Sequence, residues 1–354
     1  MKWIATLLLL ALLAWLALWP VPIEPVAWRA PPAPALEGRF EVNERLAALE
    51  WRGRGVGTGP EDVAVDTAGN VFVGYEDGRV MRFPADGAAP ELLVDTGGRP
   101  LGMAFDAEGR LVVCDGHEGL LRISMDGAMQ VLATAADGLP FGFTNDVDIA
   151  ADGRIYFSDA SWKFGPAMKA RDDILEHRGN GRLLEHDPAT GRTRVLLDGL
   201  QFANGVALAP DGDSVLVAQT GNYDVLRYWL RGPLAGTHEV FIANLPGIPD
   251  GISSNGRDTY WLALFTVRNP LLDALSGWPR LRKAVYRLPG FLQPQPAHHA
   301  FVLGLSLDGE VLHNLQHPGP DSFAPVTSAT EAHGRLYLGS LTQDAFAVLE
   351  LAGP

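Results

Sequence analysis

A hairpin pattern that recurs along the whole chain limits the fold more than any other feature of this sequence. Each copy has an apolar strand, a turn with a glycine, and a second apolar strand. The copies occupy residues 60–73, 100–113, 143–161, 203–217, 249–262 and 328–338. Their turn glycines are Gly69, Gly109, Gly153, Gly212, Gly256 and Gly334. Most spacings are near the roughly 40 to 50 residues of a propeller blade, and the two longer gaps predict insertions.

Short alternating strands follow several hairpins and raise the predicted number of strands to four per copy. They cover residues 78–83, 119–123, 181–186, 224–228 and 283–288. Six such units predict an all-β fold, a six-bladed β-propeller. A large β-sandwich is the alternative, although a sandwich needs no repeat. Propellers grow by adding blades to a ring, so 354 residues fit one domain.

The amino-terminal segment has the composition of a membrane signal. An apolar run extends from Ile4 to Trp19, and Lys2 is the only charge before it. The small residues of a cleavage site are poorly matched, which favours an uncleaved signal anchor over residues 1–23 rather than a removed signal peptide. The bulk of the chain is then expected on the exported, periplasmic or extracytoplasmic side, with secretion as the alternative.

The remainder of the chain divides into a linker and the propeller. Residues 24–40 are predicted to form a Pro-rich linker, in which residues 31–34 act as a stiff spacer. Residues 41–354 are expected to form the propeller. Cys114 is the only cysteine, which excludes a disulfide within the chain and indicates a small buried residue in a strand.

Four oxygen-bearing side chains occupy equivalent positions in four copies. Glu61, Asn145 and Asn204 each stand eight residues before the turn glycine, and Asp250 is the equivalent where the turn is two residues shorter. Innermost strands converge on the axis of a propeller, so these side chains should meet at one place. Carboxylate and amide oxygens without His or Cys suit Ca²⁺. The alternative is that they cap backbone groups at hairpin starts.

The overall charge is compatible with such a cation site. The net charge is -14. This argues against a nucleic-acid partner and against binding of anionic lipid through the whole surface.

Several motifs resemble those of the strictosidine synthase-like proteins, in particular their membrane-anchored adipocyte type. They are Phe143-Thr-Asn-Asp, Gly181-Arg-Leu-Leu-Glu, Phe202-Ala-Asn-Gly-Val, Val215-Leu-Val-Ala, Pro249-Asp, Tyr260-Trp and Gly334-Arg-Leu-Tyr-Leu-Gly-Ser. The resemblance covers nearly everything from about residue 40 onwards. More distantly, the chain is similar to paraoxonases, gluconolactonases, senescence marker protein-like propellers and diisopropyl-fluorophosphatase.

The resemblance implies specific site residues. The paraoxonase-like pattern places an axial calcium on the positions of Glu61, Asn145, Asn204 and Asp250, and a second, structural calcium on those of Asp62 and Asp146. Leu101 stands where paraoxonases have a catalytic His. True strictosidine synthases use a late catalytic Glu and an early disulfide, neither of which is matched here. Condensation of an amine with an aldehyde is therefore not expected.

These residues predict a calcium-dependent hydrolase of ester or lactone substrates, of arylesterase or lactonase type. An axial ion would polarise the carbonyl of a small-molecule substrate, while Asp250 or Glu61 acts as base or Asp250 attacks directly. The alternative is a non-catalytic, membrane-tethered binding propeller in which calcium only joins the blades.

Two insertions bear on access to this site. Residues 269–286 mix leucines and Trp278 with basic residues, which is typical either of contact with lipid or of a lid packed on the propeller. Residues 162–178 are expected to cover the same opening.

Overall fold

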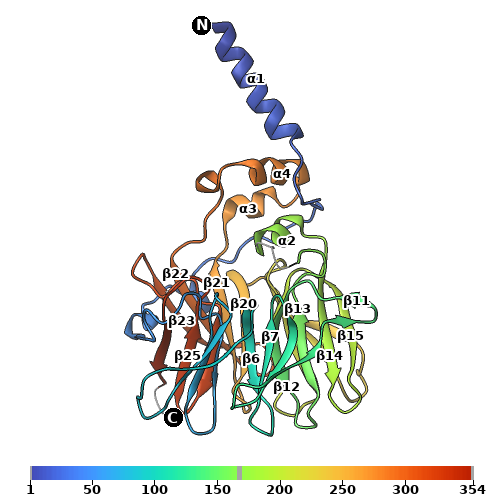
Figure 1. Cartoon of the computed structure of the whole chain (residues 1–354). Coiled ribbons are helices and arrows are strands. Elements are labelled where there is room, and N and C mark those ends of the chain that lie inside the picture. The colour runs from blue at the N-terminus through green and yellow to red at the C-terminus, as the bar shows by residue number, and fades with distance from the viewer. Residues whose placement is uncertain (1, 166–169, 352–354) are drawn as a thin grey trace.

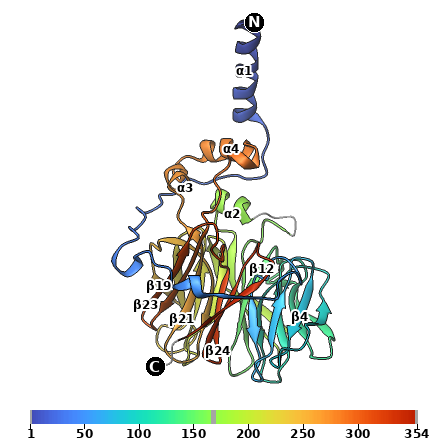
Figure 2. The same cartoon turned by 90° about the vertical axis from the view of Figure 1, so that its left-hand side faces the viewer.

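The computed structural model describes residues 2–165 and 170–351 and contains six four-stranded antiparallel sheets. The sheets stand side by side around a common axis (Figures 1 and 2). Five of them use strands that are consecutive in the chain. The predicted six-bladed β-propeller is confirmed, and the sandwich alternative was wrong.

The first five blades run in chain order from the axis to the rim. Blade one contains β2 (Val63–Val65), β3 (Val71–Gly74), β4 (Arg79–Phe83) and β5 (Glu91–Asp95). Blade two contains β6 (Pro100–Phe105), β7 (Leu111–Asp115), β8 (Gly119–Ile123) and β9 (Met129–Ala133). Blade three contains β12 (Thr144–Ile149), β13 (Ile155–Asp159), β14 (Gly181–Asp187) and β15 (Arg192–Leu200).

The fourth and fifth blades follow the same order. Blade four contains β16 (Ala203–Leu208), β17 (Ser214–Gln219), β18 (Asp224–Trp229) and β19 (His238–Ile242). Blade five contains β20 (Gly247–Ser254), β21 (Tyr260–Val267), β22 (His299–Leu305) and β23 (Val311–Pro318). A small separate hairpin pairs β10 (Ala135–Ala136) with β11 (Leu139–Pro140).

The sixth blade closes the ring with strands from both ends of the domain. It contains β24 (Ser328–Ala332), β25 (Arg335–Gly339), β26 (Phe346–Glu350) and, outermost, β1 (Glu50–Arg52). Trp51 of β1 pairs with Ala347 of β26. The ring therefore closes only when a segment that precedes the first blade joins the last one.

The predicted turn glycines occupy the backbone conformation that requires them. Gly69 has φ +85° and Gly153 has φ +83°, in the left-handed region that residues with a Cβ rarely enter. Each sits in the turn between the first two strands of its blade. The backbone conformation thus confirms the predicted hairpin turns.

One predicted strand was wrong. Of residues 283–288, all but the last belong to the helix α4 (Pro279–Arg287), and the third strand of blade five is β22, further along the chain. Pro279 starts the helix at a position where the missing N–H costs nothing, and Arg282 and Val285 then repeat at helical spacing on its inner face. The alternation in Lys283-Ala-Val-Tyr-Arg-Leu is too short to distinguish a strand from one face of a helix.

Helices gather on one side of the propeller (Figure 1). They are α1 (Lys2–Leu18), α2 (Ala170–Glu176), α3 (Pro270–Leu275) and α4, and a 3-10 turn at Gly290–Leu292 follows α4 in the chain. The 3-10 turns at Gly38–Phe40 and Arg45–Ala48 instead contact β23 of the ring. α1 projects away from the ring (Figures 1 and 2). Among the described residues, no helix combines the length and the apolar character needed to span a membrane.

The segment after α1 packs against the domain. The backbone N–H of Val26 donates to the carbonyl of Glu176 (2.9 Å), and that of Trp28 donates to the carbonyl of Ser276 (3.1 Å). Arg268 donates to the carbonyl of Pro31 (2.5 Å). These contacts show that the segment packs on the domain, while its role as a spacer that holds the domain off a membrane stays a prediction. We call residues 22–32 the strap.

Apolar clusters fill the spaces between adjacent blades. One of them joins Leu216 and Ala218 of blade four to Leu262 and Leu303 of blade five. Cys114 lies in another cluster and is fully buried, as expected, and burial raises the pKa of its thiol.

Candidate active site

The innermost strands carry an irregularity at the predicted axial positions. The register of β12 against β13 shifts between Thr144 and Val147, and that of β16 against β17 shifts between Ala203 and Val206. In β20 a shift falls between Pro249 and Ile252. Such bulges turn a side chain out of the regular alternation. They explain how Asn145, Asn204 and Asp250 can point along the axis rather than into a sheet face.

The four predicted axial residues are buried and line one cavity. Their exposed fractions are between 3 and 7% for Glu61, Asn145, Asn204 and Asp250. The cavity has a volume of about 730 Å³, and all four side chains contribute to its lining. Asn204 Nδ2 donates to Asp250 Oδ1 (2.5 Å), so blades four and five are directly linked there. The structure thus brings together every residue of the predicted axial set.

The two carboxylates of this set disfavour each other's ionised form. Burial, followed by the charges of Asp250 and Asp62, raises the pKa of Glu61 well above its ordinary value. Burial also raises the pKa of Asp250 to about 7, although the hydrogen bond from Asn204 opposes the shift. Uncompensated negative charge in a buried site needs either protons or a cation.

The donor atoms fit a hard cation. Asn204 Oδ1 is buried, and it has no hydrogen-bond partner among the residues that the structure describes. Two carboxylates and two amide groups match the oxygen ligands that Ca²⁺ takes. Across residues 2–165 and 170–351, no group of three or more His, Cys, Asp or Glu side chains is arranged for a metal ion. Any ion on the axis would therefore depend on the amides of Asn145 and Asn204 as well as on the carboxylates.

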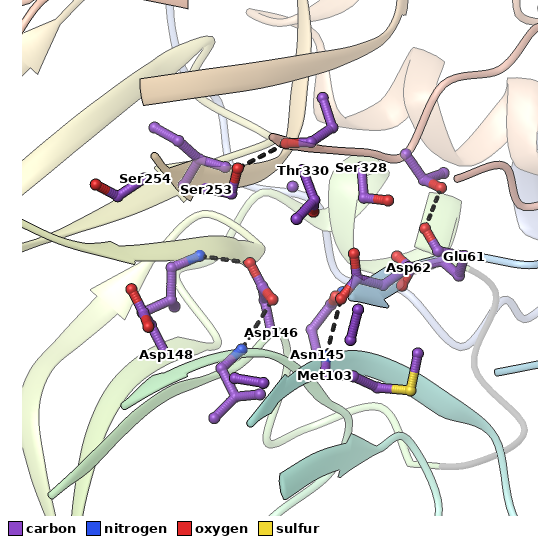
Figure 3. Close-up of a pocket in the computed structure, with 18 of the residues that line it drawn as sticks. Glu61, Asp62, Met103, Asn145, Asp146, Asp148, Ser253, Ser254, Ser328 and Thr330 are labelled. Atoms are coloured by element: carbon purple, nitrogen blue, oxygen red, sulfur yellow. Dashed lines mark hydrogen bonds between the residues drawn. The ribbon is translucent and has the colours of Figure 1, made fainter. Parts of the chain in front are cut away.

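A second cavity is lined in part by the axial residues (Figure 3). It shares Glu61, Asn145 and Asn204 with the first cavity and has a volume of about 220 Å³. Its other labelled polar residues in Figure 3 are Asp62, Asp146, Asp148, Ser253, Ser254, Ser328 and Thr330. The axial residues therefore separate two hollows of the same channel.

Asp62 and Asp146 join neighbouring blades. Asp62 Oδ2 accepts from the N–H of Met103 (2.9 Å) in blade two, and Asp146 Oδ2 accepts from the N–H of Val206 (2.7 Å) in blade four. Burial is the main cause that raises the pKa of both carboxyls. These bonds give both residues a structural role without any ion. A second structural ion at Asp62 and Asp146 stays a prediction.

The sequence analysis missed Arg99. This side chain is buried beside Glu61 in the lining of the first cavity, where its charge opposes the rise in the pKa of Glu61. Arg99 Nη2 donates to the carbonyl of Gly59 (2.9 Å), whereas its Nη1 is buried without a hydrogen-bond partner in the described part of the chain. The only feature of the sequence that could have indicated Arg99 is its position two residues before Leu101, at the start of the innermost strand of blade two.

The two insertions cover the opening of the first cavity, as expected. Ile174 and Leu175 of α2 line it, together with Leu272 and Val285 from the later insertion. We call residues 270–298 the lid. Arg171 of α2 donates to Gln293 Oε1 of the lid (2.5 Å), which joins the two insertions. Residues 166–169 of the earlier insertion lie outside the described residues.

Comparison with known proteins agrees with this architecture. The strictosidine synthase family matches residues 145–233, and the strictosidine synthase-like N-terminal family matches residues 38–83. Strictosidine synthase-like protein 6 of Arabidopsis thaliana is 36% identical over 318 residues, which cover 88% of this chain and 84% of that protein. The chain belongs to the strictosidine synthase-like family.

Another member of this family extends over nearly the whole chain. The adipocyte plasma membrane-associated protein of Rattus norvegicus is 34% identical over 364 residues, which cover 95% of each protein. Glu61 falls within the matched N-terminal family region, and Asn145 and Asn204 fall within the strictosidine synthase region. Asp250 lies beyond both.

Solved structures support the propeller fold. A gluconolactonase from Xanthomonas campestris superposes with a TM-score of 0.63 at 21% identity, covering 92% of this chain and 99% of that one. Regucalcin from Agrobacterium tumefaciens, described as a calcium-binding protein, superposes with a TM-score of 0.58 at 14% identity, covering 83% and 93%. At these identities the likeness establishes the propeller fold alone.

Proposed function

We propose that this strictosidine synthase-like propeller is a calcium-dependent hydrolase of small-molecule esters or lactones. The observation that carries the proposal is the axial set itself. Two buried carboxylates and an unpartnered amide oxygen lie at the floor of a cavity that is large enough for a small molecule. The gluconolactonase among the solved structures gives this chemistry a precedent on a related propeller.

The cation would be held by Glu61, Asn145, Asn204 and Asp250. When bound, it would polarise the carbonyl of the substrate. Asp250, oriented by the N–H of Asn204, accepts the proton of the attacking water as the new C–O bond forms. Arg99 Nη1 donates to the developing oxyanion. The C–O bond to the leaving alkoxide then breaks, and the alkoxide takes the proton back from Asp250.

Metal removal tests the proposal directly. We expect hydrolysis of aryl esters or lactones by the purified full chain to stop on chelation and to return when Ca²⁺, but not buffer alone, is added back. Turnover that is indifferent to both treatments would refute the proposal. Bound Ca²⁺ without turnover on any ester or lactone would favour a binding protein.

That second candidate is a non-catalytic, membrane-tethered propeller in which the ion only joins blades. Asp62 and Asp146 already join blades through backbone N–H groups, so further ties on the axis would continue the same arrangement. A scaffold ion raises the melting temperature without affecting chemistry. Asn204→Ala should then lower the melting temperature and have no turnover to remove.

We also propose a membrane location for the chain. The apolar helix α1 exposes Trp3, Leu7 and Leu18, and the rat relative is named as membrane-associated. The propeller would lie on the exported side, with secretion as the alternative. Protease protection of the full chain in intact cells or spheroplasts tests the orientation.

A further inference from the structure

The lid lies on the side of the molecule from which α1 projects (Figure 1), and several of its apolar side chains are exposed to solvent. Its large exposed apolar residues are Leu271, Trp278, Leu281, Phe291 and Leu292, and Phe291 is 83% exposed. This segment lies above the ring of blades, and α1 rises next to α4 (Figure 2). Clustered exposed apolar residues mark interaction surfaces.

The charge of the same segment differs from that of the rest of the chain. Residues 278–298 contain Arg280, Arg282, Lys283 and Arg287 and no Asp or Glu, whereas the whole chain has a net charge of -14. Arg282 is buried and points inward, but Arg280 is exposed and Lys283 is half-buried. Leucine, tryptophan and phenylalanine next to basic side chains form the composition of a helix that lies in a membrane interface.

The lid is also continuous with α1. Arg287 of α4 donates to the carbonyls of Leu16 (2.7 Å) and Trp19 (2.6 Å) at the end of α1. Trp15, Leu18 and Trp19 are exposed in this part of the chain. An apolar helix and an apolar, basic lid thus lie next to each other on one side of an acidic protein.

We propose that the lid is a docking surface for an anionic lipid bilayer. Its apolar residues would enter the interface while Arg280 and Lys283 meet lipid phosphates and carboxylates. The acidic remainder of the propeller is repelled by the same surface, which fixes the orientation. Because Leu272 and Val285 of the lid also line the axial cavity, docking would place the roof of that cavity at the lipid. The docking proposal itself does not depend on hydrolysis.

A spin label read out in the full chain tests this surface. Cys114 is fully buried, so a cysteine introduced at an exposed position is the only accessible thiol among the residues that the structure describes. Phe291→Cys and Leu281→Cys place the label on the lid, and Leu312→Cys, on the outer strand β23, is the matched control. Each labelled full chain is reconstituted into vesicles of phosphatidylcholine alone or with phosphatidylserine, and collisions with oxygen and with a water-soluble nickel complex are measured.

We expect oxygen to reach the labels at 281 and 291 better than the nickel complex does, and more so in vesicles with phosphatidylserine. The label at 312 should remain accessible to the nickel complex in both. The double change Arg280→Glu and Lys283→Glu should remove the preference for phosphatidylserine. Equal accessibility of 291 and 312 in all vesicles would overturn the proposal. So would burial of 291 in detergent without lipid, which would assign the surface to a second copy of the chain.

Discussion

The floor and the roof of the axial cavity are built in opposite ways. The floor takes one residue from each of four blades, and the positions of Glu61, Asn145, Asn204 and Asp250 are equivalent in the repeat. The roof is made of two insertions that have no counterpart in the other blades, held by side-chain bonds such as those of Arg171 with Gln293 and of Arg282 with Leu175. The floor is therefore fixed by the ring, while the roof is fixed by its own local contacts.

This difference predicts that the floor determines the reaction, whereas the roof determines which molecules reach the cavity. A change in the floor alters groups that the ring already holds in place, so it should affect turnover more than folding. A change in the roof should affect how the cavity opens and what reaches it, because insertions can move without breaking the ring.

The largest effect is expected for Asp250→Asn. Loss of the base should reduce ester or lactone turnover by about 10²- to 10⁴-fold. Removing one of two mutually repelling carboxylates should leave the melting temperature of the chelated protein unchanged or higher. Asp258→Asn, in an exposed turn, is the control and should leave turnover unchanged. Full activity of the Asp250 variant would remove this residue from the mechanism.

Arg99→Gln should give the next largest effect. Loss of one donor to the oxyanion should reduce kcat by about 10²- to 10³-fold, with a smaller change in KM. Arg257→Gln, whose guanidinium is exposed and bonds to Glu331, is the matched control. A variant that loses its fold together with its activity, as seen by thermal unfolding, would reduce Arg99 to a structural role through Gly59.

The residues of the cavity floor could be predicted from the sequence because they recur at equivalent positions of the repeat. Glu61, Asn145, Asn204 and Asp250 were identified by their distance from a turn glycine, and the ring geometry then required them to meet. Arg99 was not predicted, because its role depends on the direction of one long side chain and residue spacing does not determine that direction. The bulges at Asn145 and Asn204 could not be predicted either, since they appear only as shifts in the pairing of the first two strands of each blade.

The structure of the roof could be predicted from the sequence only in part. That residues 162–178 and 269–286 would be insertions followed from the long gaps between glycines. The conformation of residues 283–288 could not be predicted, because an alternation of apolar residues over six positions fits both a strand and one face of a helix. Contacts of the strap with α2 and the lid join residues at least 150 positions apart, and no local sequence pattern predicts such contacts.

In the roof, Arg282→Ala should loosen the lid without unfolding the propeller. Arg282 donates to the carbonyls of Leu175 (2.8 Å) and Ser276 (3.3 Å) and contacts that of Val26, so it joins α2, the lid and the strap. We expect chymotrypsin to cleave residues 270–298 roughly tenfold faster, because local opening precedes cleavage. Arg280→Ala, two residues away and exposed, should leave the rate unchanged. Equal rates for both variants would show that the lid is held by its apolar face instead.

The smallest expected effect is a pH dependence of the strap. Trp28 of the strap stacks on His177 with ring centroids 4.0 Å apart, and burial, with a smaller contribution from the charge of Arg282, lowers the pKa of His177 to about 3. The ordinary pKa of a free imidazole is about 6.5, so His177 binds a proton more readily when the strap is released than when Trp28 covers it.

Packing of the strap should therefore be at full strength above about pH 6.5 and weaken as the pH falls towards the lowered pKa of His177. Hydrogen exchange of residues 23–30, corrected for the intrinsic effect of pH, should accelerate several-fold between pH 7 and pH 5. His177→Phe keeps an aromatic ring beside Trp28 but cannot titrate, so its corrected exchange should not change over this range. The same acceleration in both proteins would assign the effect to a group other than His177.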